Sequence, residues 1–129
     1  MSQTPTAHAG DGPWAGPRVI SVEDALRLAR EIADAGGGIK AHCAARGWVY
    51  STTVSQCARA GVNLGAAIRA YRVRATLAHQ AARASTISAA ALAMGWTSVT
   101  TFCRARRMVR DWPEWALTSR EINRARGEA

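Results

Sequence analysis

Acidic residues are missing from the middle of this sequence. All nine Asp and Glu residues lie at positions 11–34 or 111–128, whereas positions 35–110 hold eleven basic residues and no acid. An even distribution would place about five acids in that interval. The chain of 129 residues carries a formal charge of +8, with sixteen arginines and one lysine. A GC-rich genome favours arginine and alanine but also encodes Asp and Glu freely, so the gap indicates a polyanionic partner.

Residues for catalysis or metal binding are also scarce. The three cysteines form no CxxC pair, which is typical of buried free thiols in a reducing compartment. The three histidines are scattered, and no carboxylate lies at a catalytic or metal-binding spacing from them. Neither a P-loop nor a dinucleotide fingerprint occurs. We therefore predict a protein that is not an enzyme, with no catalytic residues, no metal site and no cofactor.

Long apolar segments are absent as well. Residues 84–103 carry no charge and are long enough to span a bilayer, but they include seven Ser or Thr residues and a central Gly-Trp pair. The first seventeen residues lack the charged start and apolar run of a signal peptide. We expect a cytoplasmic, nucleoid-associated protein with no membrane contact.

Two stretches of the chain repeat each other. IKAHCAARGWVYSTTV begins at Ile39 and ISAAALAMGWTSVTTF begins at Ile87, and seven of their sixteen positions are identical at an offset of 48 residues. Two copies are too few for a solenoid, so the repeat indicates two similar structural units that act as a pair.

Helix signals divide the chain into four parts. Ser21 and Asp24 predict the start of a helix that ends before the glycines at 36–38. Each repeat copy then has the pattern of a short helix, a Gly-Trp turn and a second helix. Asn63 predicts the start of a connecting helix over 64–82, and Asp111 that of a final helix to about residue 124. The predicted parts are a disordered tail (1–17), a first helix-turn-helix unit (18–62), a linker helix (63–83) and a second unit (84–129).

Helical spacing assigns a core face and an outer face to the second helix of each unit. The expected core positions are Val54, Cys57, Phe102 and Ala105. The expected outer positions, spaced i, i+4 and i+7, are Thr52, Gln56 and Arg59 in the first unit and Thr100, Arg104 and Arg107 in the second. A linker of nineteen residues is about 28 Å long, so it can place the second helices of the two units near the roughly 34 Å that separates major-groove faces on one side of B-DNA. The fold class is therefore all-α, with two homeodomain-like helix-turn-helix units joined by a long linker helix.

The second unit resembles the AraC/XylS family of bacterial transcription regulators. The family signature sI-x-x-I-A-x-x-x-G-F-x-s-x-x-x-F-x-R is similar to TISAAALAMGWTSVTTFCR here, with Gly95, Phe102 and Arg104 in register. Arg72 and Val73 resemble the Arg–aliphatic pair of the family's spacer helix. The likeness covers about residues 22–118 and is greatest for the short, stand-alone MarA-like members, which carry no small-molecule effector domain.

The resemblance implies that the second helix of each unit enters the major groove. Arg pairs with guanine, Gln with adenine, and Thr or Val methyl groups touch thymine. The candidate base contacts are Tyr50, Ser51, Thr52, Gln56, Arg59, Ser98, Val99, Thr100, Arg104 and Arg107. The candidate phosphate contacts are Lys40, Arg46, Arg69, Arg72, Arg74, Arg106 and Arg110. For each of them the alternative is a solvated helix face, and Trp48 and Trp96 are expected to be core anchors.

We therefore predict a sequence-specific, double-stranded DNA-binding regulator of transcription, with activation as the favoured role and RNA polymerase or a sigma factor as a possible protein partner. One alternative is a small adaptor that binds RNA polymerase, a sigma factor or another regulator and has weak DNA specificity. A second is a nucleoid or RNA-binding protein that uses the basic centre without reading bases. Specific binding that survives added salt would distinguish the prediction from both.

Overall fold

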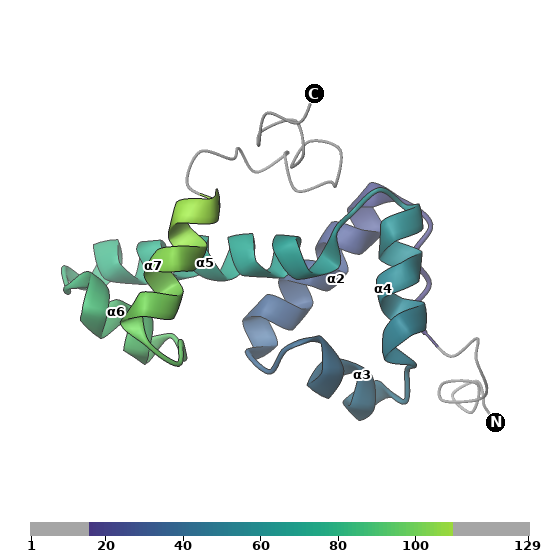
Figure 1. Cartoon of the computed structure of the whole chain (residues 1–129), viewed down its shortest axis with the longest axis horizontal. Coiled ribbons are helices and arrows are strands. Elements are labelled where there is room, and N and C mark those ends of the chain that lie inside the picture. The colour runs from purple at the N-terminus through teal and green to yellow at the C-terminus, as the bar shows by residue number, and fades with distance from the viewer. Residues whose placement is uncertain (1–15, 110–129) are drawn as a thin grey trace.

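The computed structural model describes residues 16–109, and all six of its regular elements are α-helices, as the all-α prediction requires (Figure 1). The predicted tail up to residue 15, Arg110 and the predicted C-terminal helix lie outside the described residues. The helices are α2 (Val22–Ala35), α3 (Ile39–Arg46), α4 (Tyr50–Arg59), α5 (Leu64–Arg83), α6 (Ile87–Ala93) and α7 (Val99–Val109).

Helices α2 and α5 begin where a short polar side chain accepts a hydrogen bond from a free backbone N–H group. Ser21 Oγ accepts from the N–H of Asp24 at 3.1 Å, and Asn63 Oδ1 accepts from Ala66 at 3.1 Å. The Asp24 carboxylate accepts in turn from the N–H of Ile20, and this bond lowers the pKa of that carboxyl group. Both predicted helix starts are confirmed.

Both repeat copies turn at their Gly-Trp pair in the same way. Gly47 and Gly95 adopt left-handed conformations, with φ of 71° and 88°, which a side chain would disfavour. The N–H of Trp48 donates to the carbonyl of Cys43 at 2.9 Å, and that of Trp96 donates to Ala91 at 3.0 Å. These bonds close the last turn of α3 and α6, so the repeat in sequence is also a repeat in local structure.

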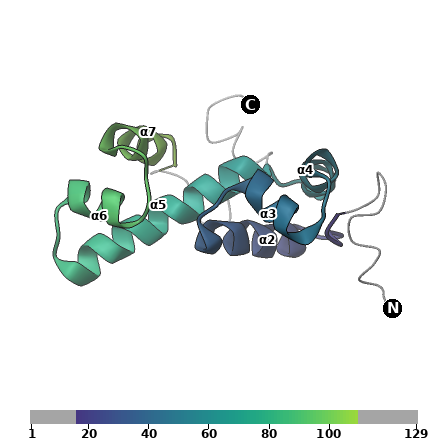
Figure 2. The same cartoon turned by 90° about the horizontal axis from the view of Figure 1, so that it is seen from below.

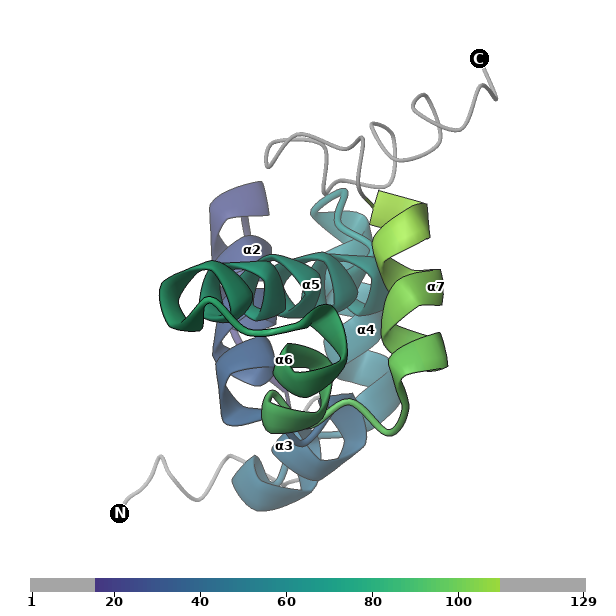
Figure 3. The same cartoon turned by 90° about the vertical axis from the view of Figure 1, so that its left-hand side faces the viewer.

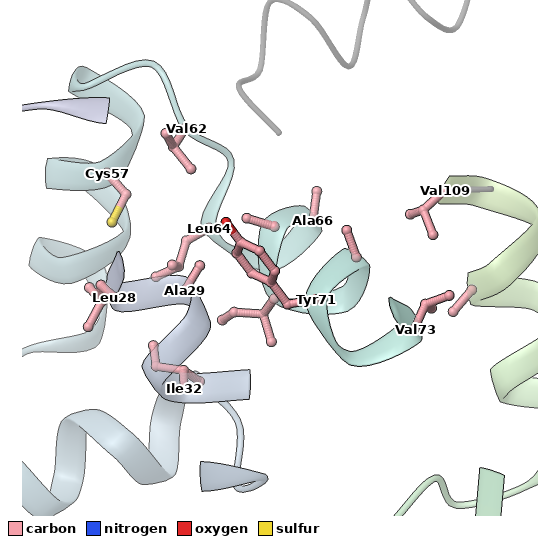
Figure 4. Close-up of a cluster of buried hydrophobic side chains, with 14 of the residues drawn as sticks. Leu28, Ala29, Ile32, Cys57, Val62, Leu64, Ala66, Tyr71, Val73 and Val109 are labelled. Atoms are coloured by element: carbon pink, nitrogen blue, oxygen red, sulfur yellow. The ribbon is translucent and has the colours of Figure 1, made fainter. Parts of the chain in front are cut away.

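Helix α5 belongs to both halves of the molecule. α2 packs along its first half, and α6 and α7 pack against its second half (Figure 1). Figure 4 shows Leu28 and Ile32 of α2 gathered with Cys57 of α4 around Leu64 and Tyr71 of α5. With twenty residues and no break, α5 is about 30 Å long and joins the two halves as one stiff element.

Within residues 16–109, no helix combines the length and the apolar character that crossing a membrane requires.

Candidate nucleic-acid interface

The outer face of α7 is open and basic. Phe102, Ala105 and Val109 are buried, so the opposite side of the helix is turned away from the core. Thr100, Arg104 and Arg107 are all exposed there, as their spacing predicts. Of the other two candidates of this unit, Val99 is half-buried, and Ser98 Oγ accepts from the N–H of Thr101 at 3.1 Å as the cap of α7.

The face predicted for α4 is correct only in part: Cys57 is buried and Arg59 is exposed as predicted, whereas Thr52 and Gln56 are half-buried. Thr53 and Cys57 form its buried side, whereas Val54 is half-buried. Thr53 is completely buried because its hydroxyl is satisfied: it donates to the carbonyl of Val49 at 3.0 Å and accepts a contact from Cys43 Sγ at 3.5 Å. The helix is therefore rolled about its axis relative to α7, in which Thr101, the equivalent of Thr53, is exposed.

The roll moves two candidate base contacts under the chain's own N-terminal segment. Gln56 is half-buried, and its Oε1 accepts a hydrogen bond from the N–H of Val19 at 3.2 Å. Gly16 lies so close to α4 that an added Cβ would be 3.0 Å from Thr52 Cγ2 and 3.1 Å from Gln56 Nε2. Residues 16 and 17, predicted to be disordered, thus border the first unit.

The exposed face of α4 consists of other residues. Ser51, Ser55 and Arg59 follow one another at intervals of four, and all three are exposed, as is Tyr50 at the start of the helix. Ser51, Tyr50 and Arg59 are among the candidates, but Ser55 is not. Ser55 could have been found from its i, i+4 spacing to Ser51. That spacing identifies the exposed side of α4 only when Thr53 is known to be buried.

The two exposed faces belong to separate helices, one in each half of the molecule. Figure 2 shows both helices nearly end on, with α7 beside α5 and α4 just beyond the N-terminal end of α5. In Figures 1 and 3 the two helices run in the same direction, and α5 spans the distance between them. No acidic residue occurs from α3 to α7, so their positive charge is not offset from within these helices.

Several candidate phosphate contacts are held against aromatic rings. Arg72 lies 4.5 Å above the ring of Trp96, and Arg46 lies 5.6 Å from that of Trp48. Lys40 is exposed, with its Nζ 5.7 Å from the ring of Tyr50. Such contacts orient a cation without neutralising it. Of the remaining candidates, Arg69 is exposed, whereas Arg74 and Arg106 are half-buried.

The buried titratable groups, His42 and Cys57, are packed in the interior of the protein. His42 packs beside Trp48, and burial, together with the charge of Arg46, lowers the pKa of its imidazole, against a smaller opposing effect of Glu31. Burial and the nearby Cys43 raise the pKa of Cys57 to about 11, so its thiol stays protonated and unreactive. Among residues 16–109, no three His, Cys, Asp or Glu side chains are grouped closely enough to hold a metal ion.

Comparisons of the chain with protein-family models, with curated proteins and with solved structures gave no match. The likeness to AraC/XylS regulators therefore rests on the residues of this chain alone.

Proposed function

We propose that this chain is a sequence-specific, double-stranded DNA-binding regulator of transcription, in which α4 and α7 are the second helices of two helix-turn-helix units and enter successive major grooves. The observation that supports this most is that α4 and α7, each with an exposed face, run in the same direction and are separated by a continuous α5 (Figure 1). The helix is about 30 Å long, and major-groove faces on one side of B-DNA are about 34 Å apart.

In the second unit, Thr100, Arg104 and Arg107 are the proposed base contacts. Arg side chains can donate two hydrogen bonds to guanine, and the Thr methyl group can touch that of thymine. The exposure of all three residues leaves these groups available.

In the first unit, Ser51, Ser55 and Arg59 are the proposed base contacts, with Tyr50 at the edge of the surface. Gln56 instead holds the N-terminal segment against α4, because its side-chain carbonyl oxygen already accepts a hydrogen bond from the N–H of Val19. The first unit therefore offers one arginine where the second offers two, and it should contribute less to sequence discrimination.

Lys40, Arg46, Arg69 and Arg106 are proposed to face phosphates, which would position the protein without selecting sequence. Such contacts also make binding sensitive to salt, because each neutralised phosphate releases counterions. Glu23, Glu31 and Asp34 are exposed on α2, and Glu31 and Asp34 line a hollow together with Arg46 of α3. These acids form a candidate contact for RNA polymerase in a cytoplasmic, nucleoid-associated activator.

Selection from a library of random duplexes tests the proposal. We expect a bipartite site whose halves are about 10 base pairs apart, since α5 fixes the spacing of the two helices. Inserting about five base pairs between the halves should abolish the preference, because the second half then faces the opposite side of the duplex. Weak binding to every duplex, with no recovered site, would contradict the proposal and favour the adaptor.

A further inference from the structure

A cleft of about 410 Å³ lies where the two halves of the molecule meet. Its walls come from three places: the α2–α3 loop at residues 36–38, the first half of α5, and the α6–α7 turn with the start of α7. The side chains that matter for its chemistry are Arg69, Arg72, Trp96, Thr97 and Thr101. The cleft therefore exists only when both halves are in place.

The charge of the cleft is entirely positive. Arg69 and Arg72 are three residues apart on α5 and so lie on neighbouring positions of one helix face. Arg72 is half-buried and fixed over the ring of Trp96, whose indole N–H is itself anchored at 2.8 Å to Thr76 Oγ1. None of the described residues that line the cleft is acidic. Arg69 and Arg72 thus line a shared space to which no described residue contributes a carboxylate.

The opposite wall is backbone rather than side chain. Gly36 and Gly38 have φ of 83° and 88°, and a Cβ built on either residue would meet no atom within 4 Å. The space at these Cβ positions is therefore open, so a ligand can approach the main chain there, but the N–H of Gly36 already donates to the carbonyl of Ile32 at 3.1 Å. The exposed Thr97 adds a hydroxyl group at the rim of the cleft.

We propose that this cleft binds a phosphate group. Guanidinium groups and hydroxyls are donors that recognise phosphate oxygens, and none of the described residues that line the cleft is an acid that would repel a phosphate. The expected source is a backbone phosphate of the bound duplex between the two half-sites, an assignment that rests on the proposed function. A free phosphate compound would offer the same chemistry, and the experiment separates the two sources.

The first arm measures binding to the selected duplex as a function of salt for Arg69→Gln and Arg83→Gln. Both variants remove one exposed charge from α5, but Arg83 lies outside the cleft. If a DNA phosphate occupies the cleft, Arg69→Gln should weaken binding roughly three- to tenfold on all sequences and reduce the slope of log K against log salt by about one. Arg83→Gln should do neither. Thr97→Glu, which places a carboxylate at the rim, should weaken binding as Arg69→Gln does.

The second arm titrates the DNA-free protein with inorganic phosphate, at constant ionic strength against chloride, and follows amide NMR signals. Selective shifts of residues 36–38 and 97 that Arg69→Gln removes show that the cleft takes phosphate. Such shifts at sub-millimolar phosphate, with equal DNA binding by the two arginine variants, identify a free phosphate compound as the source.

The proposal is overturned if the two arginine variants bind DNA equally and phosphate shifts no cleft signal. If the wild-type protein still selects a bipartite site in that case, the proposed function stands and only the phosphate site in the cleft is refuted. Conversely, phosphate-dependent shifts in a protein that selects no DNA site retain the cleft and refute the proposed function.

Discussion

The two Gly-Trp turns have the same backbone but different surroundings. Trp96 is 7% exposed, donates to Thr76 and packs edge-on against Phe102, with ring centres 5.3 Å apart. Trp48 is half-buried beside His42. The residue 48 positions before Thr76 is Leu28, which offers no hydrogen-bond acceptor. At this position, the helix that precedes the second turn offers the indole N–H an acceptor, whereas the helix that precedes the first turn does not.

The helices that follow these turns differ as well. α7 has a large ring at Phe102 to fill its core and leaves its outer face open. α4 has the smaller Val54 at the equivalent position, buries Thr53 instead, and carries residues 16–19 along its flank. A duplicated sequence therefore keeps its local motif, while the packing around each copy sets the direction in which its side chains point.

The largest expected difference between the halves concerns their cores. Phe102→Ala should lower the free energy of unfolding by about 3–5 kcal/mol, because it empties a fully buried site. The matched change Val54→Ala should lower it by only about 1 kcal/mol, since Val54 is half-buried and smaller. Denaturant unfolding of both variants measures the difference. Equal losses would show that the two copies pack alike.

The next effect concerns base discrimination. Arg104→Ala should relax the preference for one base pair by about 1–3 kcal/mol, because an exposed arginine on α7 would be lost from the groove. Gln56→Ala should leave the base preference unchanged and destabilise the first unit, because it removes the acceptor for Val19. Competition binding with single-base variants of the selected site measures both. A change of base preference in Gln56→Ala would show that Gln56 contacts a base.

A smaller effect should separate the two tryptophans. Trp96→Phe should lower the free energy of unfolding by about 1–2 kcal/mol, because it loses the hydrogen bond to Thr76. Trp48→Phe should have less effect, since the indole is only half-buried. Thr76→Val tests the bond from the other side: combined with Trp96→Phe, it should destabilise the protein by less than the sum of the single changes.

The smallest effect is a pH dependence confined to the first unit. The folded pKa of His42 lies below its ordinary value of 6.5, so the unfolded chain binds a proton at a higher pH than the folded chain does. Stability from the neutral imidazole is complete above pH 6.5 and is lost as the pH falls below that value. The equivalent position in the second unit is Ala90, which does not titrate. Hydrogen exchange should show opening of α3 below pH 6.5 and no matching change in α6, and His42→Gln should remove the difference.

The sequence predicted the helices closely because their ends depend on local chemistry. Ser21, Asn63 and the two turn glycines act through hydrogen bonds and backbone angles within a few residues, so the connecting helix begins at Leu64 as predicted and ends at Arg83 instead of 82. The face of α7 was also predictable, because Phe102 leaves little choice of core side. The aromatic side chain of α4, Tyr50, is exposed at the start of the helix, and the spacing alone permitted either Val54 or Thr53 to face inward.

What the amino acids determined by themselves is the succession of helices, the repeated Gly-Trp turn and the long interval without acids, because each depends on neighbours in the chain or on composition alone. Only the tertiary structure decided which side of α4 faces the core, the burial of Thr53, and the hydrogen bond by which Gln56 holds the N-terminal segment. Those outcomes depend on contacts such as Val19 with Gln56, which are 37 residues apart in sequence and meet only when the helices pack together.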